Sequence, residues 1–139
     1  MNACNIDLAP FPNSLQRLLL CNLTLRTDLN YLTNLNFLAM ESVKIRFPTK
    51  EEDVERVGEP FRYPPNITWL HIKGPDAKMF ADLRNLQKLT KLHIEYARMN
   101  DDQWKSLRLP KSLTDLKFEN TYIPMCDLTY LNKVTSSIR

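Results

Sequence analysis

The chain of 139 residues has only two glycines, Gly58 and Gly74, together with two histidines and three cysteines. Phosphate-cradling loops need several closely spaced glycines, so P-loop and dinucleotide-binding enzymes are excluded. Few residues remain for a metal site. No apolar run approaches the roughly 18 residues that a membrane span needs. The first residues have neither a basic start nor an apolar stretch, so we expect no signal peptide.

The chain also lacks a large excess of charge of one sign, because 19 Lys and Arg are balanced by 16 Asp and Glu, for a net charge of +3. The basic residues are scattered, which argues against nucleic-acid binding. Cys4, Cys21 and Cys126 are odd in number and far apart, as is typical of reduced thiols in a cytoplasmic or nuclear protein. The glycosylation-type triplets at Asn22 and Asn66 keep a secreted protein as the alternative.

Leucine is abundant, at 22 positions, and most of these leucines follow a repeat. Leu15-x-x-Leu18-x-Leu20-x-x-Leu23-x-Leu25 recurs as a frame of apolar residues four more times, at intervals of 20, 32, 22 and 24 residues. The frame predicts five parallel strands, near 15–20, 35–40, 67–72, 89–94 and 113–118. Because one repeat cannot bury its own apolar face, the repeats must stack on one another.

A second pattern alternates along these repeats. Extra leucine pairs precede every second strand, as in Leu29-x-x-Leu32-x-x-Leu35, and the same spacing starts at Leu83 and at Leu128. The other strands are entered from Pro12, Pro65 or Pro110. Two kinds of repeat therefore alternate through the chain.

This pattern resembles the leucine-rich repeat superfamily from about Asn13 to Val134. The resemblance implies an α/β fold over 1–139: a curved solenoid with a short parallel sheet on its concave face and irregular or helical returns on its convex face. Met99-Asn-Asp-Asp-Gln-Trp-Lys-Ser-Leu107 looks like the helical return of ribonuclease-inhibitor-like and F-box-associated repeats, with Asp101 or Asp102 in its first turn. The family's asparagine is missing at the ninth position, so we expect irregular turns.

The insertion and the two ends depart from the regular repeat. Segment 47–63 is a charged insertion, and Thr49 with Glu52 forms a capping-box pattern that predicts a helical turn there. Cys4-Asn-Ile-Asp-Leu8 echoes Cys21-Asn-Leu-Thr-Leu25, as if the chain began inside an earlier repeat. Partial repeats at both ends favour either simple caps or a piece of a longer array, and uncapped ends would allow self-association.

Alternation along the predicted strands places every second side chain on the concave face. These side chains are Arg17, Leu19, Cys21, Phe37, Ala39, Glu41, Trp69, His71, Lys73, Lys91, His93, Glu95, Asp115, Lys117 and Glu119. The predicted partner-binding set is this list without Cys21, Ala39 and Glu119 and with Tyr96 added.

Trp69 is the strongest candidate within this set, together with Arg17, Phe37, Lys91 and Tyr96. Interface hot spots are enriched in Trp, Tyr and Arg. The alternative is that the 47–63 insertion folds over Phe37 and Trp69 and buries them, since it breaks the period between their strands.

Chemistry at this face has weaker support. His71 and His93 fall in one column beside Glu95, but no third close ligand is evident from the sequence, so we expect no metal and no cofactor. Asp115 and Glu119 would lie on an open face without a pocket to exclude water, so we expect no catalytic residues. The sequence favours a non-enzymatic protein-binding module, such as an adaptor or substrate receptor. A segment of an extracellular recognition protein is the alternative.

Overall fold

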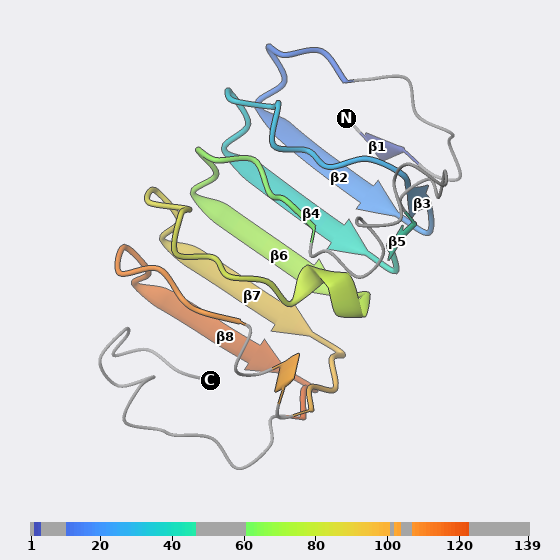
Figure 1. The fold of residues 1–139 in the computed structure, drawn as a ribbon, viewed down its shortest axis with the longest axis vertical. Helices are drawn as coiled ribbons and strands as arrows, with labels where there is room; N and C mark the ends of the chain where they lie inside the picture. The colour runs from blue at the N-terminus through green and yellow to red at the C-terminus, as the bar shows by residue number, and fades with distance from the viewer. Residues whose placement is uncertain (1, 4–10, 47–60, 101, 104–106, 123–139) are drawn as a thin grey trace, which may run out of the picture.

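The computed structural model describes residues 2–3, 11–46, 61–100, 102–103 and 107–122, which form a parallel solenoid (Figure 1). Six strands pair side by side in the order β1-β2-β4-β6-β7-β8. Their bounds are β1 Asn2–Ala3, β2 Arg17–Cys21, β4 Phe37–Glu41, β6 Trp69–Lys73, β7 Lys91–Glu95 and β8 Asp115–Glu119. A second, two-stranded parallel sheet joins β3 (Thr24–Leu25) to β5 (Lys44–Ile45).

The long strands pair in the register that the repeat frame predicts. Leu18 aligns with Leu38, then with Leu70, Leu92 and Leu116 across the sheet. Each strand begins two residues later than predicted and ends one residue later. The cause is that the first leucine of each repeat, such as Leu35, belongs to the turn that enters the strand, where its N–H donates to the Leu32 carbonyl.

The N-terminal strand follows the sequence echo. Asn2 pairs with Leu19 and Ala3 with Leu20, which is the same offset that aligns Cys4 with Cys21 in the sequence. The opposite end of the described sheet is β8. The third leucine pair, at Leu128 and Leu131, lies outside the described residues.

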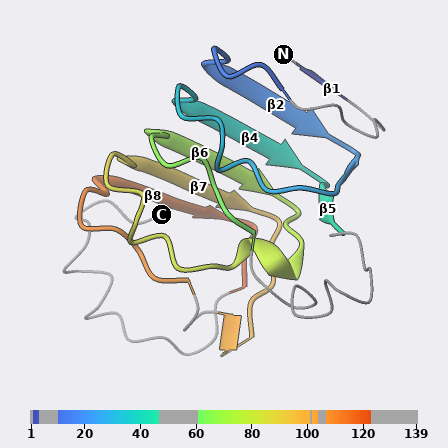
Figure 2. The ribbon, with the colours of Figure 1, turned by 45° about the horizontal axis from the view of Figure 1, so that its top comes forward.

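The core lies between the six-stranded sheet and the returning segments (Figure 2). One continuous cluster of buried side chains joins all the described repeats. Its fully buried members include Leu18, Leu38, Leu70 and Ile94. The leucine pairs that precede β4 and β7 are buried as well: Leu29 and Leu32, and Leu83 and Leu86. Apolar burial of this kind supplies most of the stability of a solenoid.

The returning segments contain little helix, which differs from the expected α/β fold. The connections before β4 and β7 are tight turns, in which Leu32 and Leu86 each donate an N–H to the carbonyl three residues earlier. Among the described residues, regular helix is limited to the 3-10 turn η2 (Ala77–Met79) and to Asp102–Gln103. The physical reason is the shortness of these connections: two consecutive turns span the core in fewer residues than a helix would need.

The return after β7 does begin as a helix. The Asn100 side chain accepts a hydrogen bond from the Gln103 N–H at 2.8 Å, and the Gln103 side chain accepts one from the Asn100 N–H at 2.9 Å. This reciprocal pair is a capping box. The expected acid at Asp101 lies outside the described residues.

The chain turns after each long strand through one residue in the left-handed region. These residues are Asn22, Ser42, Gly74, Tyr96 and Asn120, with φ between 48° and 58°. Each of the first four donates its N–H to the carbonyl at the end of the next strand. The turns are therefore regular, contrary to our expectation, because backbone hydrogen bonds join each of these turns to the next strand. At the ninth position Thr121 also uses its hydroxyl, which contacts the carbonyls of Ile94 and Glu119.

The end of the 47–63 insertion packs into the core. Phe61 and Tyr63 are buried with their rings edge to face, 4.9 Å between centroids, and the Tyr63 hydroxyl donates to the Met79 carbonyl at 2.7 Å. Burial raises the pKa of Tyr63 well above its usual range. The expected helical turn at Thr49 lies outside the described residues. In the described part of the chain, no helix is long and apolar enough to cross a membrane.

Candidate functional site

The open face of the six-stranded sheet, meaning the side of β2, β4, β6, β7 and β8 that faces away from the core, carries three rows of side chains. The register sets the rows. Row one is Arg17, Phe37, Trp69, Lys91 and Asp115; row two is Leu19, Ala39, His71, His93 and Lys117; row three is Cys21, Glu41, Lys73, Glu95 and Glu119. All the strand residues of the predicted partner-binding set thus lie on one surface.

Row one is a continuous stack of cations and aromatic rings. The Arg17 guanidinium lies 4.3 Å from the centroid of the Phe37 ring. Phe37 meets Trp69 edge to face at 4.9 Å, and the Lys91 ammonium lies 5.3 Å from the Trp69 ring. Aromatic and cation–π pairs of this kind each contribute about 0.5–1.5 kcal/mol. Strands β4 and β6 are therefore direct neighbours despite the insertion between them.

Phe37 and Trp69 differ in how much of their surface is exposed to solvent. Phe37 is 8% exposed because Arg17 and Trp69 cover it, whereas Trp69 keeps 39% of its surface exposed. The described end of the insertion, at Phe61 and Tyr63, lies in the core and not on the open face. Trp69 is thus the large apolar group that row one presents to solvent.

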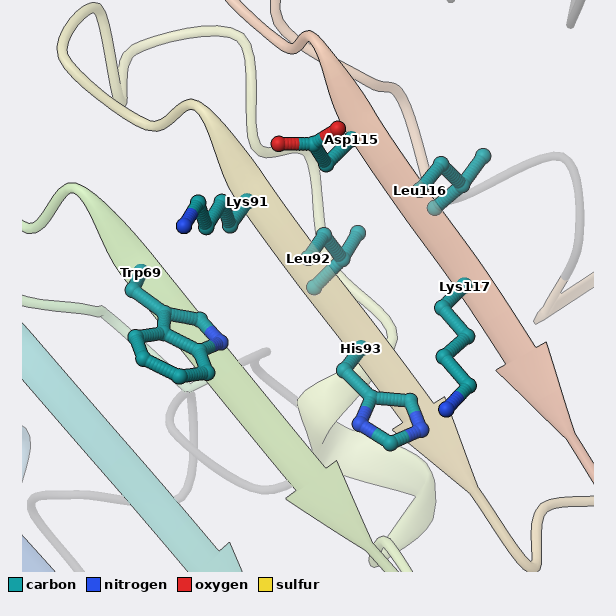
Figure 3. Close-up of a pocket in the computed structure, with 7 residues that line it drawn as sticks. All are labelled: Trp69, Lys91, Leu92, His93, Asp115, Leu116 and Lys117. Atoms are coloured by element: carbon teal, nitrogen blue, oxygen red, sulfur yellow. The ribbon is translucent and has the colours of Figure 1, made fainter. Parts of the chain in front are cut away.

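A shallow pocket of about 340 Å³ lies beside Trp69, across β6, β7 and β8 (Figure 3). Its walls are Trp69, Lys91, Leu92, His93, Asp115, Leu116 and Lys117. Trp69 forms one side with the amino group of Lys91 beside it, and Asp115 and Lys117 line the pocket from β8 (Figure 3). The pocket combines an apolar wall with two cations, which suits an acidic side chain beside an apolar one.

Row two contains two stacked histidines. The rings of His71 and His93 are 4.4 Å apart between centroids and tilted by only 5°. Each Nε2 lies 3.2 Å from a carboxylate oxygen of row three, His71 from Glu95 and His93 from Glu119. Partial burial and the neighbouring His71 lower the pKa of His93, and its contact with Glu119 only partly opposes this.

Row three contains three acids and one cation, Lys73, which lies between Glu41 and Glu95. Lys73 Nζ lies 3.4 Å from Glu41, and this hydrogen bond and charge raise the pKa of Lys73. Desolvation works to raise the pKa of Glu95, but the hydrogen bond with His71 and the charge of Lys73 lower it overall. Lys117 Nζ lies 3.5 Å from Glu119. The charges of this row are therefore largely paired within the surface.

Tyr96 directly follows Glu95, the last residue of β7. Its side chain is 57% exposed, and Lys73 Nζ lies 5.3 Å from its ring. A bulky residue in the left-handed region is strained, and such strain is concentrated at functional sites. Tyr96 therefore extends the open face at the edge where the chain turns.

Two further residues of the open face are less distinctive. Leu19 is 42% exposed in row two, beside Ala39. Cys21 is half-buried, and its Sγ accepts a long hydrogen bond from the Asn22 side chain at 3.5 Å. Asp115 and Glu119 lie in different rows, so they do not form a paired acid and base.

Two features of this surface were missed by sequence reasoning. Glu119 was not selected for the partner-binding set, although it contacts His93 and Lys117. The repeat register would have indicated it, since His71 with Glu95 and His93 with Glu119 are equivalent pairs one repeat apart. The left-handed conformation of Tyr96 has no sequence signal of its own, because the equivalent residues Asn22, Ser42, Gly74 and Asn120 differ in type.

No family model, curated protein or solved structure matches the chain.

Proposed function

We propose that the chain is a leucine-rich repeat protein that binds a protein partner through its open face and does no chemistry. The in-register ladder of buried leucines and one left-handed turn for each strand support this membership. In this proposal the protein acts in the cytoplasm or nucleus as an adaptor or substrate receptor. The odd number and wide separation of the three cysteines favour a reducing compartment.

The row-one stack is the observation that carries the proposal. Trp69 is held between Phe37 and Lys91 and remains exposed, so a partner would meet a rigid aromatic anchor. Anchors of this type dominate binding energy because little side-chain entropy is lost when they are covered. Folding alone does not require a large, partly exposed apolar ring at this position.

The charges of the open face argue for a protein and not for nucleic acid. It carries four cations, Arg17, Lys73, Lys91 and Lys117, and four anions, Glu41, Glu95, Asp115 and Glu119. Phosphate backbones select surfaces of one sign. A partner segment with an acidic side chain next to an apolar one matches the pocket beside Trp69.

A comparison of two double variants tests this proposal. Trp69→Ala with Lys91→Ala removes the anchor and its cation, whereas Tyr122→Ala with Lys88→Ala removes an exposed aromatic residue and a lysine outside the open face. Affinity purification from cell extract, quantified by mass spectrometry, should recover specific partners with wild type and with the Tyr122/Lys88 variant but not with the Trp69/Lys91 variant. Melting curves and far-ultraviolet circular dichroism establish that all three proteins are folded.

Equal recovery by all three folded proteins would contradict the proposal. Loss of partners in both double variants would also contradict it, because binding would then depend on stability or on another surface. A purified partner should further quench the fluorescence of Trp69 in a Trp104→Phe background, which leaves Trp69 as the single tryptophan.

A further inference from the structure

The stacked histidines and their carboxylates form a cluster with the donor set of a transition-metal site. His71, His93 and Glu95 each offer one ligand atom, and these atoms all lie within 4.8 Å of one another. We infer that His71, His93 and Glu95 bind one divalent transition-metal ion, such as Zn²⁺, on the open face. This site reverses the expectation from the sequence, which rested on the lack of a third close ligand.

The spacing of the ligand atoms supports this inference. Metal bonds of about 2.0–2.2 Å at tetrahedral angles place neighbouring ligand atoms about 3.3–3.5 Å apart. His71 Nε2 and Glu95 Oε2 are already 3.2 Å apart. His93 must approach them by no more than about 1.5 Å to complete the same triangle.

The side chains can make this movement without moving the sheet. Register pairs His71 with His93 on adjacent strands, so their Cα atoms stay fixed while the rings tilt. The parallel rings must tilt toward each other, because the lone pairs of two parallel imidazoles do not converge. The side chains of His71, His93 and Glu95 are 30%, 19% and 17% exposed, which leaves room on the solvent side.

The surrounding charges accommodate a dication. The two nearby ammonium groups each have a carboxylate partner, Lys73 with Glu41 and Lys117 with Glu119. Glu119 also holds His93 Nε2 at 3.2 Å and can release it when the ring turns to the ion. Two imidazoles, one carboxylate and an open fourth position for water match the donor preference of Zn²⁺.

Cobalt titration of tag-free protein tests the site, because Co²⁺ is a visible probe for zinc sites. Wild type should bind one equivalent and show the visible d–d absorption of a tetrahedral Co²⁺ complex. Zn²⁺ should displace it. His93→Gln and Glu95→Gln should each weaken binding by at least about tenfold, since even lost outer-shell partners cost about 10–100-fold.

Asp115→Asn is the matched control, because it removes a carboxylate from the same face outside the cluster. It should bind as wild type does. Lys117→Gln should bind more tightly than wild type, since it removes a positive charge that repels the ion. A role of these residues in folding alone would not produce tighter binding.

Three results would overturn the inference. One is no saturable binding by wild type, and another is unchanged affinity in both His93→Gln and Glu95→Gln. The third is an intense near-ultraviolet thiolate-to-cobalt band, which would place the ion on a cysteine such as Cys21. The titration needs no partner, so its outcome is independent of the proposed protein-binding function.

Discussion

Gly74 and Tyr96 occupy equivalent positions, one residue after the adjacent strands β6 and β7, and both have a left-handed backbone, with φ of 58° and 52°. The Gly74 N–H donates to the Glu95 carbonyl, and the Tyr96 N–H donates to the Glu119 carbonyl, so both complete the same turn. Glycine adopts this conformation without strain, whereas tyrosine does not. The turn geometry is thus imposed by the stacking of repeats and not by the residue that occupies it.

Replacing Tyr96 by asparagine should stabilise the protein. Asn22 and Asn120 already fill the equivalent turns, and asparagine tolerates the left-handed region. We expect Tyr96→Asn to raise the free energy of unfolding by about 0.5–1 kcal/mol, measured by urea denaturation, because relief of strain outweighs the loss of an exposed ring. The same variant should bind a partner less well. A clear loss of stability would show that the Lys73–Tyr96 contact outweighs the strain.

The strand positions could be predicted from sequence because a simple period controls them. Leu18, Leu38 and Leu92 must all face one core, and a shift of one residue would turn every strand inside out. The same period placed Trp69 and Lys91 in one row. The requirement that the leucines be buried therefore predicts both the core and the open face.

The contacts between side chains could not be predicted in this way. The period does not show that β4 pairs directly with β6 across the insertion, which is what brings Phe37 to Trp69. It also does not show that Glu95 reaches His71. The helical returns that the resemblance implies are not confirmed, because the described returning segments are mostly turns, with helix limited to Ala77–Met79 and Asp102–Gln103.

Truncation of a ladder leucine should be costly, and truncation of an open-face leucine should not. Leu92 is 1% exposed, so Leu92→Ala should lower the free energy of unfolding by about 2–5 kcal/mol through lost burial and a cavity. Leu19 is 42% exposed, so Leu19→Ala should change it by less than about 1 kcal/mol. Urea denaturation of both variants measures the difference. Similar losses would refute the assignment of Leu19 to the open face.

Asp28 should be important as a hydrogen-bond acceptor in the core. It is the buried polar residue of the described chain, and its Oδ1 accepts the Arg62 N–H at 3.0 Å where the chain returns from the insertion. Asp28→Ala leaves this N–H without its acceptor and should cost about 1–3 kcal/mol. Asp28→Asn keeps the Oδ1 acceptor and should cost less. Equal thermal stability of Asp28→Ala and wild type would contradict the role.

The ion pair of Asp82 and Arg84 should give a small, acid-sensitive contribution to stability. The Arg84 side chain donates to both carboxylate oxygens of Asp82, at 2.7–3.1 Å, and the Arg84 N–H donates to Oδ1 at 3.0 Å. Hydrogen bonding to the Arg84 side chain lowers the pKa of Asp82 below its usual 3.8, although desolvation opposes it. The folded state therefore holds this proton less tightly than the unfolded state does.

Because the folded pKa is the lower one, this stabilisation is complete above the unfolded pKa of 3.8 and disappears as the pH falls through the folded value. Both side chains are well exposed, at 43% and 58%, so solvent screening limits the contribution to about 1 kcal/mol or less. A carboxyl NMR titration should give Asp82 a midpoint below 3.8 in wild type and a higher one in Arg84→Gln. Added salt should narrow the gap between the two proteins. Identical midpoints in low salt would show that the ion pair does not persist in solution.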